Sequence, residues 1–329
     1  MKIRKKNILK LFQDPVEDKR ISIDLYFKQI HKEIGAIKKK NTIIFSGYKF
    51  PNILPDFFNI KFRISRYIFF PLYFLFTQKK INHILDQSYG HLLFFKLFSK
   101  NIITVHDLIP LLAWKKKIDS SIYKSNPLLF KLSLIGLKKA DKIVAVSQST
   151  KDDIIRELGI NPSKITVIHN GVSKNFRPFD KQRKAEAKNY FNLNNDSFKV
   201  LIVGNSLYKN IESSFEVIKK ANQITKKSLH LVWLGGSYQY QNIIEKKLGK
   251  LGASTIVTKL NESECIKLYN SVDCLLFPSY YEGFGLPPLE AMSCGIPVIS
   301  SNIKVFKELY DDAAMMANPK DTDSMCNFL

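Results

Sequence analysis

The sequence predicts an α/β protein built from two doubly wound, Rossmann-like domains. Short apolar runs alternate with stretches of helical character, which is typical of parallel sheets covered by helices on both faces. The 329 residues exceed one ordinary domain, and 45% of them are hydrophobic, enough for two cores. A charged segment that begins with little periodicity, residues 173–188, separates two such series. We therefore place an N-terminal domain at residues 1–178 and a C-terminal domain at residues 179–329.

The first half alternates strand-like and helix-like runs in the order that a parallel sheet requires. Strands are expected at residues 7–12, 42–45, 82–85, 102–105, 142–146 and 165–168, and helices at 20–34, 128–140 and 150–158. The second half repeats the pattern. Strands are expected at residues 199–203, 229–234, 254–258, 273–277 and 298–300, and helices at 211–226, 261–270, 287–292 and 302–310, with one more beginning near Asp321.

The charge is distributed unevenly along the chain. The formal net charge is +22, and residues 1–180 carry 33 basic and 14 acidic side chains, leaving 18 and 15 for the rest. An excess of one sign on one domain favours an anionic partner, either nucleic acid or the anionic face of a membrane, although lysines that serve only solubility would give the same balance. No known nucleic-acid-binding module is found, so we expect contact with an anionic membrane and not with nucleic acid.

The apolar run Tyr67–Phe76 bears on the same question. It is about half the roughly 20 residues that a spanning helix needs, and Pro71 interrupts it. The run either lies in a membrane interface, flanked by its Lys and Arg residues, or forms an ordinary buried helix.

Four cysteines without C-x-x-C spacing indicate reduced core thiols, and no apolar run of signal-peptide length follows the charged N-terminus. Together they predict a cytoplasmic protein, with possible peripheral contact at the inner face of the cell membrane.

A strand, loop and helix start near the C-terminus contain the densest functional signal. The strand at 273–277 leads into Glu282-Gly283-Phe284-Gly285-Leu286, and Pro287 and Pro288 follow in the first turn of a helix. Glycines let the main chain approach a ligand, and a helix N-terminus favours a phosphate. Glu290, about one turn into the helix, is placed to accept hydrogen bonds from ribose hydroxyls, and Glu282 to reach the group beyond the phosphates. Alternatively, Glu290 only complements the helix N-terminus and Glu282 is a solvated turn residue.

Two other strand ends carry candidate site residues. The loop after the strand at 199–203 contains Gly204, Asn205 and Lys209, and Lys209 is the candidate for contact with a diphosphate. Neither G-x-G-x-x-G nor G-x-x-x-x-G-K occurs, which disfavours a dehydrogenase or a P-loop enzyme. His106 directly follows the strand at 102–105, where ligands of parallel sheets bind. Residues 86–89 and His91 end another strand, and for them structural contacts are the favoured interpretation.

The segment Glu-Gly-Phe-Gly-Leu-Pro-Pro-Leu-Glu-Ala-Met at 282–292, followed by Cys-Gly-Ile-Pro-Val-Ile at 294–299, resembles the nucleotide-sugar loop of the retaining family 4 glycosyltransferases. The resemblance implies the B-type fold, with the donor held by the C-terminal domain and the acceptor by the N-terminal domain. It implies that Glu282 orients the donor sugar, Glu290 binds the ribose, and His106 contacts the sugar. It also implies front-face attack assisted by the leaving phosphate, with no metal and no separate cofactor. Donor contacts are expected from Gly204, Asn205, Lys209, Gly283, Phe284, Gly285, Leu286 and Glu290.

The chain departs from the family pattern in three places. Residues 14–18 replace the usual Gly-Gly loop, Asn205 stands where the family often has arginine, and the C-terminal end is expected to be truncated before the last helix of the fold. Asp321-x-Asp323 mimics a metal-binding motif of the other glycosyltransferase class, but its position at a helix start indicates a cap.

The resulting hypothesis is a hexosyltransferase that uses a nucleotide sugar, with GDP-mannose as the suggested donor and a glycan or lipid-linked glycan as the acceptor. Two alternatives remain open: an inactive, truncated, membrane-associated binding protein, and a nucleotide-sugar epimerase of the same fold.

Overall fold

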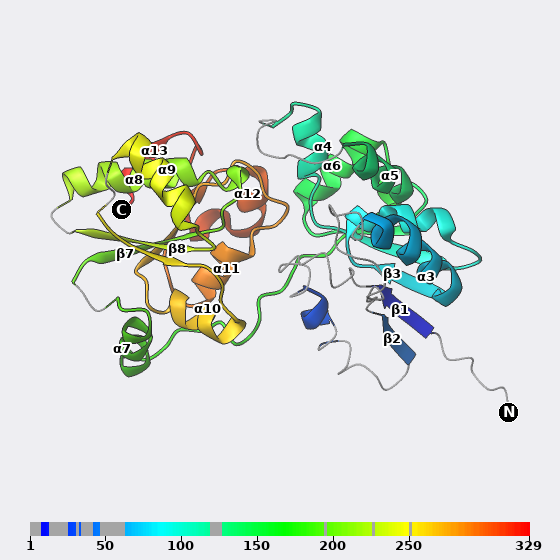
Figure 1. The fold of residues 1–329 in the computed structure, drawn as a ribbon, viewed down its shortest axis with the longest axis horizontal. Helices are drawn as coiled ribbons and strands as arrows, with labels where there is room; N and C mark the ends of the chain where they lie inside the picture. The colour runs from blue at the N-terminus through cyan, green and yellow to red at the C-terminus, as the bar shows by residue number, and fades with distance from the viewer. Residues whose placement is uncertain are drawn as a thin grey trace. The chain divides into compact units, whose positions relative to one another are not determined.

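The computed structural model describes residues 8–12, 26–30, 33, 42–46, 63–118, 127–193, 196–225, 228–249 and 252–329. These form two compact α/β units (Figure 1). Unit 1 comprises residues 1–111 and 124–169, and unit 2 comprises residues 112–123 and 170–329. Each unit contains a six-stranded sheet in which all neighbouring strands are parallel. The expectation of two doubly wound domains is therefore confirmed.

The sheet of unit 1 has the strand order β2-β1-β3-β4-β5-β6. Its strands are β1 (Ile8–Phe12), β2 (Thr42–Ser46), β3 (Ile81–Ile84), β4 (Lys100–Val105), β5 (Lys142–Ala145) and β6 (Ile165–Val167). Its helices are the π-helical turn η2 (Ser65–Phe69), α3 (Phe70–Thr77), the 3₁₀ segment η3 (Gln87–Phe95), α5 (Pro127–Leu137), α6 (Gln148–Leu158) and η5 (Pro162–Lys164), while α4 (Ile109–Trp114) crosses the division between the units. Residues 14–18 lie outside the described part. Of the helix expected at 20–34, the described residues 26–30 and 33 are helical.

The sheet of unit 2 has the strand order β12-β11-β10-β7-β8-β9. Its strands are β7 (Phe198–Val203), β8 (Leu229–Leu234), β9 (Ala253–Val257), β10 (Cys274–Phe277), β11 (Val298–Ser301) and β12 (Met315–Ala317). Its helices are α7 (Lys181–Tyr190), η6 (Leu207–Lys209), α8 (Ile211–Ile224), α9 (Tyr238–Leu248), α10 (Glu262–Tyr269), α11 (Leu286–Ser293), α12 (Lys304–Tyr310), η7 (Asp311–Ala313) and α13 (Thr322–Asn327).

Successive residues of a strand point to opposite faces of the sheet, and in the second sheet helices cover both faces. On one side, Val200, Trp233 and Leu276 pack against α8, α9 and α13. On the other side, Leu201 and Phe277 pack with residues of α10, α11 and α12. This three-layer arrangement fixes the loops that leave the carboxyl ends of β7 and β10.

In unit 1, α3 covers β1, and α5 packs tightly on η3. The Phe12 and Phe74 ring centroids lie 4.8 Å apart, and the Lys10 ammonium donates to the carbonyl of Thr77 at the end of α3. At Gly90 and Gly136 the two backbones meet directly. A Cβ on Gly136 would lie 2.0 Å from the carbonyl oxygen of Gly90.

Replacing Gly136 with alanine is therefore expected to lower the thermal unfolding midpoint by several degrees, since overpacking of rigid atoms costs about 1–3 kcal/mol. Helix propensity alone would favour alanine by roughly 1 kcal/mol, so the sign of the change isolates the backbone contact. Gly171→Ala is the matched control, because its new Cβ meets no atom within 4 Å. A Gly136→Ala midpoint equal to or above that of the control would contradict the close packing of α5 on η3.

Candidate active site

The strand order of unit 2 defines where a ligand can bind. Connections from β7 lead toward β8 and β9, and connections from β10 lead toward β11 and β12 on the other side. The carboxyl ends of β7 and β10 therefore form the topological switch point, and in open α/β sheets ligands bind in the crevice outside it. The Gly204–Lys209 loop leaves β7, and the Pro278–Gly285 loop leaves β10.

Lys209 and Glu282 meet at this switch point. The Lys209 ammonium lies 2.5 Å from the Glu282 Oε1 atom, and the Ser279 hydroxyl donates to the same oxygen at 2.9 Å. The ammonium also lies 4.6 Å from the centroid of the Phe277 ring. The Glu282 side chain is only 9% exposed and that of Lys209 15%. Glu282 is therefore not a solvated turn residue.

The two loops are joined by backbone and amide hydrogen bonds. Asn210, in a left-handed conformation (φ 56°), donates from its side chain to the carbonyls of Pro278 and Pro319 at 2.9 and 2.7 Å. The Tyr280 N–H donates to the carbonyl of Tyr208. These contacts position the short turn η6, and with it Lys209, against the loop that carries Glu282.

A glycine is required where Lys209 passes the end of β7. Gly204 has a φ of +98°, and a Cβ there would lie 3.2 Å from the Cγ of Lys209. Asn205, the next residue, is exposed at the same edge of the sheet. The structure thus brings Lys209 to the crevice and leaves Asn205 open to solvent at its side.

The start of α11 forms the other side of the site. Gly285 precedes the helix with a φ of +93°, and a Cβ there would lie 2.6 Å from the Phe306 ring. Leu286 begins the helix, prolines follow in its first turn, and Gly283 and Phe284 are buried. Pro287 and Pro288 carry no N–H, so this turn can offer a phosphate the N–H of Leu286 and the positive end of the helix dipole.

Glu290 lies one turn further along α11, and its side chain is half-buried. Its Oε2 atom accepts a hydrogen bond from the Tyr269 hydroxyl at 2.9 Å. Burial raises the Glu290 pKa from its ordinary 4.5 to about 7, with Glu262 adding to the rise and the Tyr269 hydrogen bond opposing it. Burial and the neighbouring Glu290 also raise the pKa of Tyr269 well above its usual range. A carboxylate that only complemented the helix N-terminus would have a lowered pKa. At Glu290 burial outweighs any such effect, because the pKa is raised.

Three residues that hold this site were not predicted from the sequence: Ser279, Asn210 and Tyr269. Asn210 follows Lys209 directly, and a left-handed asparagine ahead of a helix is a recognised pattern, so the sequence offered a signal for it. Tyr269 lies on α10, 21 positions before Glu290, and no spacing rule connects the two.

In unit 1, His106 lies at the carboxyl end of β4, as expected. Its Nε2 atom donates to the carbonyl of Leu85 at 2.8 Å, and its N–H donates to the Gln87 side chain at 2.9 Å. Its ring meets Tyr26 edge to face, with centroids 4.8 Å apart. Because a carbonyl oxygen can only accept, the Nε2 atom of His106 must carry a proton. When the ring is neutral, its Nδ1 atom is therefore the acceptor. The histidine is thus held in one orientation.

Residues 86–89 and His91 have structural contacts, and that interpretation is confirmed. The ring of His91 bonds to the Ser133 hydroxyl at 3.1 Å and to the Arg66 carbonyl at 3.0 Å. The Asp86 side chain accepts the N–H of Ser88 at 2.6 Å, and residues 87–93 are buried in η3.

Other sequence predictions are resolved by local contacts. Asp321 caps α13 by accepting the Ser324 N–H, which confirms its capping role, and Asn261 forms a capping box with Glu264. All four cysteines are free, three of them buried. Across the described ranges no group of three His, Cys, Asp or Glu residues could hold a metal ion, and none of the described helices has the length and apolarity to cross a membrane.

The Lys209–Glu282 contact yields a test of how the site is held. In Lys209→Met, a buried carboxylate loses its cation, and we expect a loss of about 3 kcal/mol in the free energy of unfolding. The double variant Lys209→Met/Glu282→Gln removes both charges and is expected to regain most of that stability. Lys220→Met breaks an exposed pair with Asp323 and serves as the control with a much smaller loss. A double variant as unstable as the single one would refute the charge-pair account.

Glu290 gives a pH-dependent prediction. Its pKa is raised on folding, so between pH 4.5 and 7 the folded state binds more protons here than the unfolded state. The contribution is fully present below about pH 4.5 and is lost as pH rises through about 7, a change on the order of 3 kcal/mol. The thermal midpoints of the parent and of Glu290→Gln, measured from pH 4.5 to 8, should differ least near pH 4.5, where Glu290 is protonated and neutral like glutamine. The midpoint of the parent should then fall relative to that of the variant as pH rises through about 7. Parallel curves would show that Glu290 ionises normally.

The sequence matches two families of known proteins. The profile described as Glycosyl transferases group 1 matches residues 183–325, and Glycosyltransferase Family 4 matches residues 46–176. The O-antigen chain mannosyltransferase RfbU of Salmonella typhimurium is 33% identical over 232 residues, 69% of this chain and 59% of RfbU. The serotype-specific mannosyltransferase WbdA of Escherichia coli is 29% identical over 69% of this chain and 28% of WbdA. The chain thus spans less than two thirds of these relatives.

The solved structures agree with this fold. Sucrose-phosphate synthase from Thermosynechococcus elongatus superposes with a TM-score of 0.74 at 19% identity, covering 98% of this chain and 88% of that one. Anabaena HepE in complex with UDP-glucose gives the same TM-score at 14% identity and the same coverage. The two family profiles together match most of the sequence, and the 282–292 segment lies at the switch point of the second sheet. The chain therefore belongs to the group 1, family 4 glycosyltransferases, which have the B-type fold.

Proposed function

We propose that this protein transfers a hexose from a nucleotide-diphosphate sugar to a glycan or lipid-linked glycan, with retention of configuration. One observation carries the proposal: the buried Lys209–Glu282 pair lies at the switch point of unit 2, where the loop to the N-terminus of α11 begins. A cation, a helix start and a buried carboxylate at one strand edge suit a sugar linked to a diphosphate.

The donor is proposed to be GDP-mannose. RfbU and WbdA are both named as mannosyltransferases, and RfbU shares 33% identity over 69% of this chain. HepE was solved with UDP-glucose but is only 14% identical to this chain. It therefore supports a nucleotide sugar as the class of donor and does not identify the sugar or the base. GDP-mannose is therefore the first donor to test, and UDP-glucose the second.

Lys209 would act on the leaving group. As the bond between the sugar and the diphosphate breaks, negative charge grows on the phosphate oxygens, and a positioned ammonium stabilises it. The N–H of Leu286 at the start of α11 would add to this stabilisation. Loss of one such positioned donor typically costs about 3–4 kcal/mol of transition-state stabilisation. This electrostatic role needs no metal ion.

Glu282 and Glu290 would accept hydrogen bonds from donor hydroxyls. A phosphate that takes the ammonium of Lys209 releases the Glu282 carboxylate to bind the sugar. Glu290 would accept hydrogen bonds from the ribose. These donors would favour its charged form and so oppose the rise in its pKa that burial causes. His106, whose Nε2 proton is engaged with Leu85, is proposed to face the sugar through its Nδ1 acceptor.

A lipid-linked acceptor would place the reaction at a membrane. The balance of 33 basic to 14 acidic side chains in residues 1–180 supports contact with anionic lipids, and we propose that the protein works at the cytoplasmic face of the cell membrane.

The donor pocket can be tested without an acceptor. One of GDP, UDP and ADP, with GDP the expected one, should raise the thermal midpoint, because a ligand at 100 times its dissociation constant adds about 2.7 kcal/mol of stability. Glu290→Ala should weaken binding of that nucleotide roughly tenfold or more, since a lost hydrogen bond to a charged group costs about 1.5–3 kcal/mol. If no nucleotide shifts a protein that still unfolds cooperatively, the pocket assignment and the enzyme hypothesis both fail, and a binding protein without catalysis becomes the better account.

Chemistry is then measured with labelled GDP-mannose and a membrane lipid extract. Transfer would move label into the lipid fraction with release of GDP, and Lys209→Met should slow it by roughly 10² to 10³. Conversion of the sugar to its epimer without any acceptor would instead identify an epimerase.

A further inference from the structure

Unit 1 exposes an apolar face that its own core does not explain. On η2 and α3, Ile68, Leu72 and Phe76 are 53%, 42% and 80% exposed, and their spacing of four residues puts them on one side of the helix. After η3, Leu97 and Phe98 are 59% and fully exposed. Scattered apolar side chains are ordinary on a protein surface, but a contiguous group of large ones marks an interaction site.

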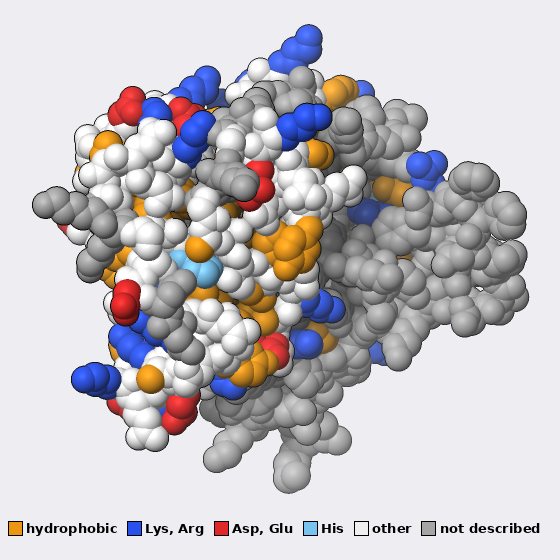
Figure 2. All heavy atoms as spheres, turned by 60° about the vertical axis from the view of Figure 1, so that its left-hand side comes forward, with side chains coloured by type: hydrophobic (Ala, Val, Ile, Leu, Met, Phe, Trp, Pro, Cys, Tyr) orange, Lys and Arg blue, Asp and Glu red, His pale blue; other side chains and the backbone are white. Residues whose placement is uncertain are grey.

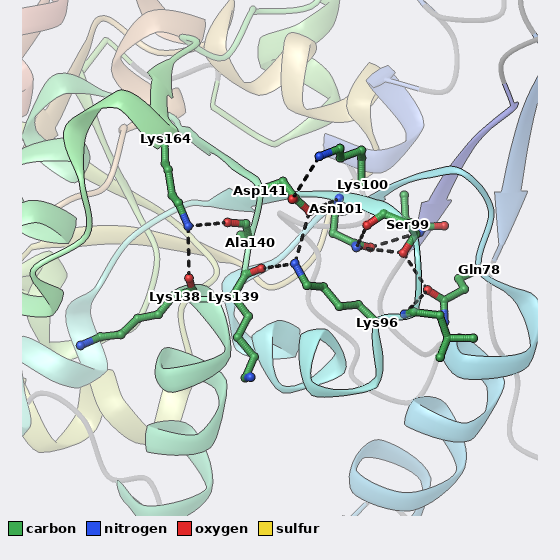
Figure 3. A network of polar contacts seen from close by, with 12 residues as sticks. Gln78, Lys96, Ser99, Lys100, Asn101, Lys138, Lys139, Ala140, Asp141 and Lys164 are labelled. Carbon is green, nitrogen blue, oxygen red and sulfur yellow. Dashed lines mark hydrogen bonds and ion pairs between the residues drawn. The ribbon is translucent and has the colours of Figure 1, made fainter.

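The helix and the turn after η3 form one connected surface. Gln78, at the end of α3, donates from Nε2 to the carbonyls of Leu75 and Phe95, both at 3.1 Å. Its Oε1 atom accepts from the N–H of Leu97 at 3.1 Å and from the Ser99 hydroxyl at 2.7 Å (Figure 3). Three of these four hydrogen bonds, those with Phe95, Leu97 and Ser99, therefore fix the turn at residues 94–99 to the end of α3. The turn presents Leu97 and Phe98 from a backbone that is already ordered, so little entropy is lost when they are buried.

Lysines surround the turn. Lys96 donates to the carbonyl of Lys139 at 2.8 Å and lies 3.5 Å from the Asp141 carboxylate, which Lys100 also approaches (Figure 3). The Lys139 ammonium lies 5.4 Å from the centroid of the Phe94 ring. Between residues 63 and 100 the only acidic residue in the sequence is Asp86, and it is fully buried. The face is therefore apolar and basic, without an exposed carboxylate from this stretch.

This combination distinguishes the partner. A second copy of the same face would set lysines against lysines, which is unfavourable. A nucleic acid would match the lysines but leave the large aliphatic and aromatic side chains in water. An anionic lipid surface matches both, because rings and leucines enter the interface while ammonium groups remain at the headgroups. In unit 2, by contrast, the face that comes forward in Figure 2 shows basic and acidic side chains interspersed.

We propose that the outer face of η2 and α3, together with the 94–99 turn, is the surface by which this protein binds anionic membranes. This proposal rests on the proposed function, in which a lipid-linked acceptor brings the protein to a membrane, and it assigns the membrane contact to particular side chains. The turn precedes β4 and His106 follows it, so about 17 Å of strand separates the turn from the sheet edge that carries His106. Binding lipid therefore leaves that edge open.

The test is co-sedimentation of the full chain with vesicles. We expect the parent protein to bind vesicles of phosphatidylglycerol and phosphatidylcholine in equal amounts, and to bind pure phosphatidylcholine much more weakly. Phe76→Asp/Phe98→Asp should lower the partition coefficient on the mixed vesicles at least about tenfold, since each substitution removes an exposed ring that lipid would bury and adds a charge that the anionic surface repels. Ile224→Asp is the matched control, because Ile224 is 67% exposed on α8 of unit 2, and binding should stay within about twofold.

Two results would overturn the assignment: equal binding by the double variant and the parent, or a parent protein that forms a dimer in gel filtration which Phe76→Asp/Phe98→Asp dissociates. Nucleotide-induced thermal shifts, measured without lipid, separate this proposal from the proposed function. A double variant that loses vesicle binding and keeps its nucleotide response supports the surface. Vesicle binding with no nucleotide response in the parent would leave the surface intact and refute the donor site.

Discussion

The site of unit 2 depends on one buried ion pair. Removing the Lys209 and Glu282 side chains from water carries a desolvation cost that their mutual attraction offsets only with good geometry and further hydrogen bonds. The geometry is supplied by Ser279, by the Phe277 ring and by the loop contacts of Asn210. A pair of this kind adds little net stability over apolar residues, so its presence at the end of two core strands points to function. It keeps the crevice electrically balanced without a ligand, and a diphosphate can replace the carboxylate as the partner of Lys209.

Glu290 complements this arrangement in a different way. Its carboxyl accepts a hydrogen bond from the Tyr269 hydroxyl, and burial raises its pKa to about 7, so that it is about half protonated near neutral pH. A bound diol that donates hydrogen bonds would stabilise the carboxylate form. We therefore propose distinct parts for the two glutamates: Glu282 would exchange Lys209 for sugar hydroxyls, while Glu290 would add ribose hydroxyls to the hydrogen bond that it accepts from Tyr269.

The fold could be predicted to a large extent because the strands of a parallel sheet covered on both faces must be apolar on both sides. Each strand therefore stands out in the sequence as a short apolar run. The 282–290 loop could be predicted because glycine and proline have strict backbone requirements, and Gly285 meets one with a φ of +93°. What could not be predicted depends on packing between distant segments. The 3₁₀ segment η3 has no regular hydrophobic period, and its closeness to α5 rests on Gly90 and Gly136, which lie 46 positions apart. Likewise, Tyr269 reaches Glu290 only because α10 and α11 cover the same face of the sheet.

The two edges of the first sheet separate two kinds of chemistry. At the carboxyl edge, His106 is held by hydrogen bonds to Leu85 and Gln87, and we propose that it contacts the sugar. At the amino edge, Gln78 holds a turn of exposed apolar residues among lysines. In a βαβ unit the crossover helix runs antiparallel to the strands, so a protein resting on the outer face of α3 has its strands roughly parallel to the lipid surface. In the proposed orientation the carboxyl edge would open sideways along the membrane, where the proposed lipid-linked glycan could reach it while its lipid stays in the bilayer.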